Sequence, residues 1–136
     1  MSQKIALITG VGPGTGSSLA RCFHSEGYKV AMVARNKDRL KDLENELENS
    51  KGFICDVRNV ESIENTVNEV VDNFGHPDTF IHNAVRGIRG SFLDFTVRDL
   101  QSNFDTNVTS LLRFSQLLCP KTVSYTHLTL PTIVSV

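Results

Sequence analysis

The chain has 136 residues, of which 40% are hydrophobic and 21% charged, and its formal net charge at pH 7 is −1. This composition is typical of one globular domain, and the near-zero charge does not favour binding to nucleic acid or to an anionic membrane. No apolar run approaches the length of a transmembrane helix. The three cysteines are far apart, which favours reduced thiols. We therefore expect a cytoplasmic protein without nucleic acid or membrane as partner.

The first predicted elements are a strand over Lys4–Thr9 and a helix over Thr15–Glu26, joined by a turn of the form Gly-x-x-x-Gly-x-Gly. A strand that leads through glycines into a helix binds a dinucleotide pyrophosphate, because the backbone comes close to the phosphates and the helix N-terminus favours negative charge. No Gly-Lys-Ser/Thr follows, so the turn is not a P-loop. The alternative is a structural loop that is rich in glycine for steric reasons. The candidate cofactor-binding residues of this turn are Thr9, Gly10, Gly14, Thr15 and Gly16.

The chain then alternates between short apolar runs and helical periodicity. Further strands are predicted over Tyr28–Ala34, Gly52–Cys55 and Thr79–His82. Further helices are predicted over Lys37–Glu48, Val60–Phe74 and about Val97–Leu118. Strands that alternate with helices at this spacing predict an α/β fold with a parallel sheet.

Polar residues follow these strands at the ends where open parallel sheets bind their ligands. Arg35 follows the second strand, where an NAD site would carry an acidic residue. A cation there suits a 2′-phosphate, so NADP is favoured over NAD, unless Arg35 is a solvated residue at a helix start. Asp56 follows the third strand, where its carboxylate could accept the adenine amino group or simply approach the next helix. Asn83 and Ala84 follow the fourth strand.

Taken together, these residues resemble the short-chain dehydrogenase/reductase family, from Lys4 to about Pro120. The glycine-rich turn and the threonine before it match the family's coenzyme motif. Asp56 and Val57 match its adenine-site pair. Two further matches lie in later segments of the chain: the centre of the Asn-Asn-Ala-Gly motif at Asn83-Ala84, and the asparagine of the catalytic tetrad at Asn107.

Two positions depart from the family's fourth-strand motif. His82 stands where the motif has its first asparagine, and Val85 stands where it has glycine. Val85 therefore adds a branched side chain where the family's backbone passes close to the cofactor.

The resemblance implies a Rossmann-type doubly wound sheet of strand order 3-2-1-4, truncated after about four strands. It also implies hydride transfer between a nicotinamide and a carbonyl or alcohol substrate, and a homo-oligomeric parent protein. The family's catalytic Tyr-x-x-x-Lys is missing, because neither Tyr28 nor Tyr125 has a lysine four residues later. We therefore expect this fragment to be inactive. The alternative is a dinucleotide-binding module without catalytic activity.

The C-terminal segment has an interpretation of its own. Residues 123–132 resemble the translation of a transposon-type sequencing adapter. We therefore expect residues 1–121 to be the N-terminal half of a Rossmann domain and residues 122–136 to be a non-native tail. The alternative is that Pro131–Val136 forms a native fifth strand, with the family's serine at Ser135.

Overall fold

The computed structural model of the chain describes residues 3–119 and 133–135. The strands are β1 (Ile5–Thr9), β2 (Lys29–Ala34), β3 (Ser50–Ile54), β4 (Thr79–His82) and β5 (Ile133–Ser135). The helices are α1 (Thr15–Ser25), α2 (Lys37–Glu46), α3 (Val60–Phe74), α4 (Val97–Phe104) and α5 (Ser110–Leu118). A 3₁₀ turn, η1 (Phe92–Asp94), precedes α4, and a π-helical segment, η2 (Asp105–Thr109), joins α4 to α5.

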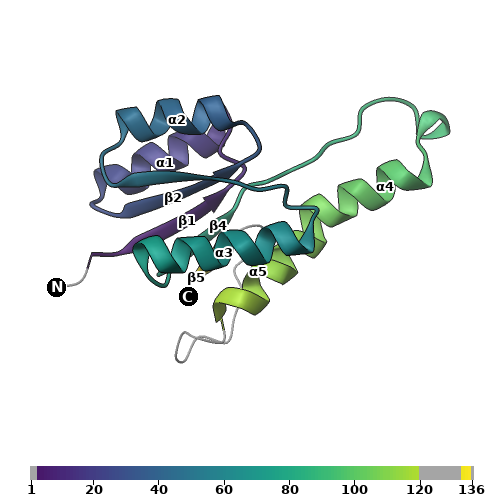
Figure 1. Cartoon of the computed structure of the whole chain (residues 1–136). Coiled ribbons are helices and arrows are strands. Elements are labelled where there is room, and N and C mark those ends of the chain that lie inside the picture. The colour runs from purple at the N-terminus through teal and green to yellow at the C-terminus, as the bar shows by residue number, and fades with distance from the viewer. Residues whose placement is uncertain (1–2, 120–132, 136) are drawn as a thin grey trace.

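The strands form one sheet of order β3-β2-β1-β4-β5 (Figure 1). β1 pairs in parallel with β2 and β4, and β2 pairs in parallel with β3, which confirms the predicted order 3-2-1-4. In this register Thr9 lies beside both Val33 and His82, so these strands end at the same edge. β5 runs antiparallel to β4, whereas a doubly wound sheet would continue with a parallel strand.

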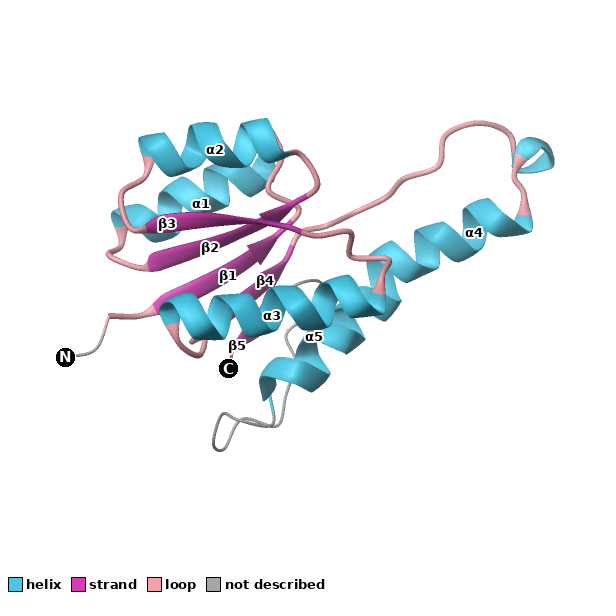
Figure 2. Ribbon diagram, viewed as in Figure 1, coloured by secondary structure: helices cyan, strands magenta, loops and turns pink. Residues whose placement is uncertain are grey.

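Helices cover both faces of the sheet, as Figure 2 shows, with α1 and α2 on one face and α3 and α5 on the other. Alternate residues of β1 point to opposite faces, so Leu7 packs in the core beneath α3 and α5 while Ile8 packs beneath α1 and α2. Both side chains are fully buried. Two apolar layers therefore hold the sheet in place, and the strand ends are left free to carry a site.

Local capping explains where most of the helices begin. The side chains of Asn36 and Asn59 accept backbone N–H bonds at the starts of α2 and α3, and Thr96 forms a capping box with Asp99 at the start of α4. α1 differs, because Gly14 gives it no side-chain cap. The N–H of Ser17, in its first turn, donates instead to the carbonyl oxygen of Gly12 at 3.2 Å.

The long helix predicted over residues 97–118 forms, but it is not regular throughout. η2 interrupts it at Asp105–Thr109, and a local π-helical turn of this kind is frequent at functional sites. α4 contains no buried residue and extends beyond the sheet (Figure 1). Among the described residues, none of the helices combines the length and the apolar character needed to cross a membrane.

Candidate functional site

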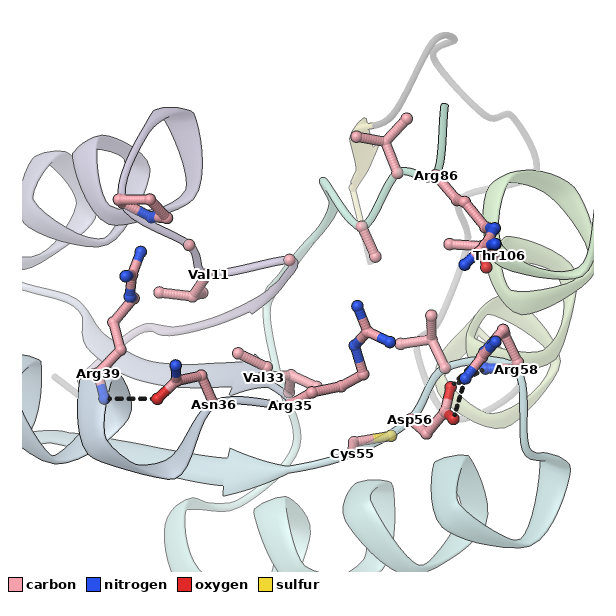
Figure 3. A pocket seen from close by; sticks show the side chains of 17 residues that line it. Val11, Val33, Arg35, Asn36, Arg39, Cys55, Asp56, Arg58, Arg86 and Thr106 are labelled. Atoms are coloured by element: carbon pink, nitrogen blue, oxygen red, sulfur yellow. Dashed lines mark hydrogen bonds and ion pairs between the residues drawn. The ribbon is translucent and has the colours of Figure 1, made fainter. Parts of the chain in front are cut away.

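A cavity of about 440 Å³ lies at the carboxyl ends of the parallel strands (Figure 3). Its lining comes from the turn after β1, the ends of β2 and β3, the segment after β4, and η2. The lining residues are 10–13, 33–36, 39, 55–58, 84–86 and 106. Of the residues predicted from the sequence, Gly10, Arg35, Asp56, Val57 and Ala84 line this cavity.

The glycines of the turn differ in what surrounds them. Gly10 has φ +68°, and a Cβ added there would lie 2.5 Å from the backbone nitrogen of Ala84. A Cβ on Gly16 would lie 2.6 Å from the Cα of Val11. In contrast, a Cβ on Gly12 or Gly14 would meet nothing within 4 Å. Gly10 and Gly16 are therefore needed for packing, whereas Gly12 and Gly14 leave open space beside the uncapped start of α1.

Thr9 ties the turn to the end of β4. Its buried hydroxyl oxygen accepts hydrogen bonds from the backbone N–H groups of Asn83 (3.1 Å) and Ala84 (3.2 Å). The side-chain amide of Asn83 donates to the carbonyl oxygen of Gly10 at 3.1 Å. Thr9 and Asn83, together with Gly14, Thr15 and Gly16, lie outside the cavity lining. Thr9 and Asn83 therefore shape the site through the backbone that they fix.

Arginines dominate the charge of the cavity. Arg35, Arg39, Arg58 and Arg86 line it, and Asp56 is the carboxylate among the lining residues (Figure 3). The sequence prediction found Arg35 and missed the other three. Arg39 lies one helical turn after Arg35 in a loop-to-helix segment, and this spacing was an available signal.

Asp56 forms a bidentate ion pair with Arg58. The Arg58 Nε donates to Oδ1 at 3.0 Å and its Nη2 donates to Oδ2 at 2.9 Å, while the Arg58 backbone N–H also donates to Oδ1. These bonds hold the pKa of Asp56 below its usual value, although partial burial opposes them, and the charge of Arg35 adds to the effect. The carboxylate therefore stays negative and keeps lone pairs free to accept a further hydrogen bond.

Asn107 lies in η2 and pairs with the backbone of Arg86 in both directions. Its Nδ2 donates to the Arg86 carbonyl oxygen, and its Oδ1 accepts from the Arg86 N–H, each at 2.9 Å. Asn103 donates to the same carbonyl oxygen at 2.6 Å and accepts a second hydrogen bond from Asn107 Nδ2. Asn107 therefore lies behind the cavity wall and fixes the segment that follows β4.

The two departures from the fourth-strand motif have different surroundings. Val85 lines the cavity and is 79% exposed. Its side chain therefore lies at the rim and does not disturb the core. His82 is 1% exposed and lies between β1 and the long helix.

The fold agrees with comparisons to known proteins. A family model described as short chain dehydrogenase matches residues 4–127, and the chain belongs to this family. Its α/β sheet of order 3-2-1-4 is the Rossmann-type fold of this family.

Among relatives, an uncharacterized oxidoreductase of Staphylococcus aureus (strain N315) is 32% identical over 122 residues, which are 88% of this chain and 53% of that protein. A solved structure of actinorhodin polyketide ketoreductase with NADPH is 30% identical, with a TM-score of 0.81 over 87% of this chain and 48% of that one. The L-sorbose reductase of Gluconobacter frateurii, solved with NADPH and L-sorbose, is 28% identical, with a TM-score of 0.80 over 88% of this chain and 48% of that one. The chain thus spans about half the length of the relatives that it matches.

Proposed function

We propose that the cavity at the strand ends binds NADP and that the whole protein is an NADP-dependent short-chain oxidoreductase. The observation that carries the proposal is the meeting of an open glycine turn with four arginines in one cavity. Bare backbone at Gly12 and Gly14 and the positive end of the α1 helix dipole suit a pyrophosphate. The guanidinium groups of Arg35 and Arg39 suit a 2′-phosphate, which NAD lacks. Two structural neighbours were solved with NADPH, in agreement with this choice.

Each part of the dinucleotide has a candidate partner in this chain. The turn from Gly10 to Gly16 would hold the pyrophosphate, and Thr15 would lie at the helix start beside it. Arg35 and Arg39 would hold the 2′-phosphate. Asp56 and the adjoining backbone of Val57 would contact the adenine, while the segment Asn83-Ala84 would support the nicotinamide half. Bound NADP(H) supplies the hydride acceptor or donor of the reaction.

For the whole protein we propose hydride transfer on a small carbonyl or alcohol substrate. Asn107 contributes by holding the segment after β4 through the Arg86 backbone. The general acid and base of the reaction is a phenol whose pKa a nearby lysine brings toward neutrality, and this chain has no Tyr-x-x-x-Lys sequence.

We therefore propose that the 136-residue chain alone binds the coenzyme without turning over substrate. Incubation of the purified chain with NADPH and a panel of ketones and aldehydes is expected to leave the absorbance at 340 nm unchanged. Oxidation of NADPH that disappears in the Asn107→Ala variant would contradict this expectation.

The second candidate function is a dinucleotide-binding module that performs no hydride transfer. The observation that favours it is the exposed Val85 side chain at the cavity rim, in place of the family's glycine. The native sequence beyond residue 121 separates the two candidates. A serine after the next strand and a following Tyr-x-x-x-Lys favour the enzyme, and other residues there favour the module.

NADP preference is tested by exchanging the charge of Arg35. In Arg35→Asp we expect the Kd for NADPH to rise about 10- to 100-fold, because a charge-assisted contact contributes about 1.5–3 kcal/mol. The Kd for NADH should fall or stay constant. Lys41→Asp makes the same charge change at an exposed position of α2 outside the cavity lining and serves as the control. Equal weakening in both variants, measured by fluorescence titration, would remove Arg35 from its role.

We also propose that residues 122–136 are a non-native tail, on the basis of their resemblance to a translated adapter. Most of this segment lies outside the described residues, and the family match runs to residue 127 and so into it. The source DNA should be amplified and read through codon 121 with a different library chemistry. A reading frame that continues into new sequence supports the proposal, and a return of the same tail contradicts it.

Finally, we propose that the parent protein is a homo-oligomer. Large apolar side chains lie exposed along the long helix, spaced three or four residues apart, and we call them the α4–α5 stripe. They are Val97, Leu100, Phe104, Val108 and Leu112. A continuous apolar strip of this kind on a helix is typical of a surface that packs against another subunit.

A further inference from the structure

The side chain of His82, the last residue of β4, connects the end of β1 to η2. Its Nδ1 lies 2.8 Å from the hydroxyl oxygen of Thr9 on β1. On the other side of the ring, Nε2 lies 2.8 Å from the hydroxyl oxygen of Ser110 and 3.2 Å from the carbonyl oxygen of Thr106 in η2. The ring is thus a bridge between the sheet edge and the long helix.

The hydrogen bonds around the ring determine where its proton lies. The Thr9 oxygen already accepts from the N–H groups of Asn83 and Ala84, so its two lone pairs are used and its own hydrogen points to Nδ1 of His82. The Ser110 hydroxyl donates to the Thr106 carbonyl oxygen at 2.5 Å, so its oxygen is free to accept from Nε2. Every partner is satisfied when the imidazole is neutral and carries its hydrogen on Nε2.

Protonation of the ring would break this arrangement. A hydrogen on Nδ1 would face the Thr9 hydroxyl, whose lone pairs are already occupied by two backbone N–H groups. Within residues 3–119, the hydrogen-bond and ring partners of His82 are Thr9, Thr106, Ser110, Phe80 and Phe114, and none of these five is titratable. Burial lowers the pKa of His82, although the hydrogen bond to the Thr106 carbonyl oxygen opposes this shift.

The bridge ends on the residues that shape the cavity. Thr9 fixes the backbone at Asn83 and Ala84, at the beginning of the segment 83–86. Thr106 is adjacent to Asn107, whose side chain fixes Arg86 at the end of that segment. Through its two nitrogens His82 therefore reaches both ends of one wall of the cavity.

We propose that His82 is a positioning residue: its neutral imidazole, hydrogen on Nε2, sets the placement of segment 83–86 and of Asn107 in η2. The consequence for coenzyme binding rests on the proposed function, whereas the structural coupling does not. The alternative is that His82 has no positioning role and only fills space between the rings of Phe80 and Phe114. The centroids of these rings lie 5.9 and 6.1 Å from the centroid of the His82 ring.

The first test measures the full chain without any ligand. Nitrogen-15 NMR of the histidine rings, with the His82 signals assigned by their loss in His82→Asn, reports which nitrogen carries the hydrogen. We expect the Nε2–H tautomer at pH 7, persisting below the ordinary imidazole pKa. A hydrogen on Nδ1, or a charged ring at pH 7, would overturn the proposal.

The second test compares two variants by hydrogen exchange at the Arg86 backbone N–H. His82→Phe keeps an aromatic ring but removes both nitrogens, and we expect exchange at Arg86 to accelerate by up to about fivefold, the effect of one lost hydrogen bond worth about 1 kcal/mol. His82→Asn keeps a hydrogen-bond acceptor and a donor, and restores the residue type that the resembled motif has here, so we expect exchange near that of the unchanged chain. Equal exchange in all three proteins would show that the ring only fills space.

The pH profile adds a readout that a space-filling ring would not change. The protection of Arg86 should be complete above the ordinary imidazole pKa and be lost as the pH falls through the lowered pKa of His82 in the folded chain. In His82→Asn this loss should be absent, and this profile alone decides the question if His82→Phe does not fold. A decline of equal size in both proteins would contradict the proposal.

NADPH titration of the same variants then separates the two proposals. Weaker binding in His82→Phe and recovery in His82→Asn would support both. If the unchanged chain does not bind NADPH, the proposed function fails for this chain, while the tautomer and the exchange rates still decide the role of His82.

Discussion

Gly10 and Gly14 belong to one turn but serve different physical purposes. The backbone of Asn83 and Ala84 fills the space where a Cβ of Gly10 would lie, and the positive φ of Gly10 is unfavourable for other residues. Around Gly14 the corresponding space is empty. At the scale of single residues, the motif thus combines positions that the fold requires with positions that keep room for a ligand.

This difference predicts opposite results for two substitutions. Gly10→Ala should lower the free energy of unfolding by about 2–5 kcal/mol, because the residue is both strained and overpacked. Gly14→Val should leave the unfolding midpoint of the ligand-free chain close to that of the unchanged chain, and abolish NADPH binding by filling the pyrophosphate space. Thermal unfolding with and without NADPH measures both effects. A Gly14→Val variant that the coenzyme still stabilises would contradict the assignment.

The long helix shows how an irregular element can position a site. η2 turns Asn107 toward the segment after β4, where its amide group makes a reciprocal pair with the Arg86 backbone. Asn103, about one turn earlier, donates to the Arg86 carbonyl oxygen and accepts from the Asn107 amide. Of these two side chains, Asn107 is therefore the one that accepts the hydrogen bond of the Arg86 N–H.

At this scale we predict that Asn107→Ala accelerates hydrogen exchange at the Arg86 N–H about fivefold, since a lost hydrogen bond is worth about 1 kcal/mol. Asn103→Ala is the matched control, because it removes a neighbouring amide without removing the acceptor of that N–H. Exchange rates measured by NMR on the ligand-free chain compare the two. A larger effect in Asn103→Ala than in Asn107→Ala would contradict the prediction and show that Asn103 supports the Arg86 backbone.

For the whole molecule, the surface feature that predicts a partner is the α4–α5 stripe. Its side chains are between 48% and 72% exposed, although all are large and apolar. α4 extends beyond the sheet, so the described residues of this chain do not cover it (Figure 1). Burial of such a surface against a second copy would remove apolar area from water.

We predict that the chain self-associates through this stripe. The double variant Leu100→Glu and Phe104→Glu should shift the sedimentation coefficient toward that of a monomer at micromolar concentration. Ile54→Glu changes another exposed apolar side chain, 58% exposed at the end of β3, and should leave the association state unchanged. Association that persists in the double variant would place the interface elsewhere.

The sequence alone was sufficient for the order of elements, the parallel sheet and the family, because each rests on local patterns. Buried strands appear as short apolar runs, helices show their period of 3.6, and a glycine-rich turn between a strand and a helix has few other uses. The same patterns selected Arg35, Asp56 and Asn83 as residues after strands. Helix ends were predicted less well: α2 ends at Glu46, earlier than expected, and the chain then turns at Asn49, which has a φ of 63°.

Only the tertiary structure decided which side chains meet. Arg58 clamps Asp56, Arg39 joins Arg35 in the cavity, and His82 links Thr9 to Thr106, none of which the sequence prediction anticipated. Arg58 lies two residues from Asp56 and Arg39 lies four from Arg35, but His82 contacts residues that are 73 and 24 positions away in the chain. Pairing of this kind depends on strand register and on packing between layers, which no short pattern encodes. The sequence by itself determined the class of fold and which residues follow its strands, and the folded chain determined which of those residues meet.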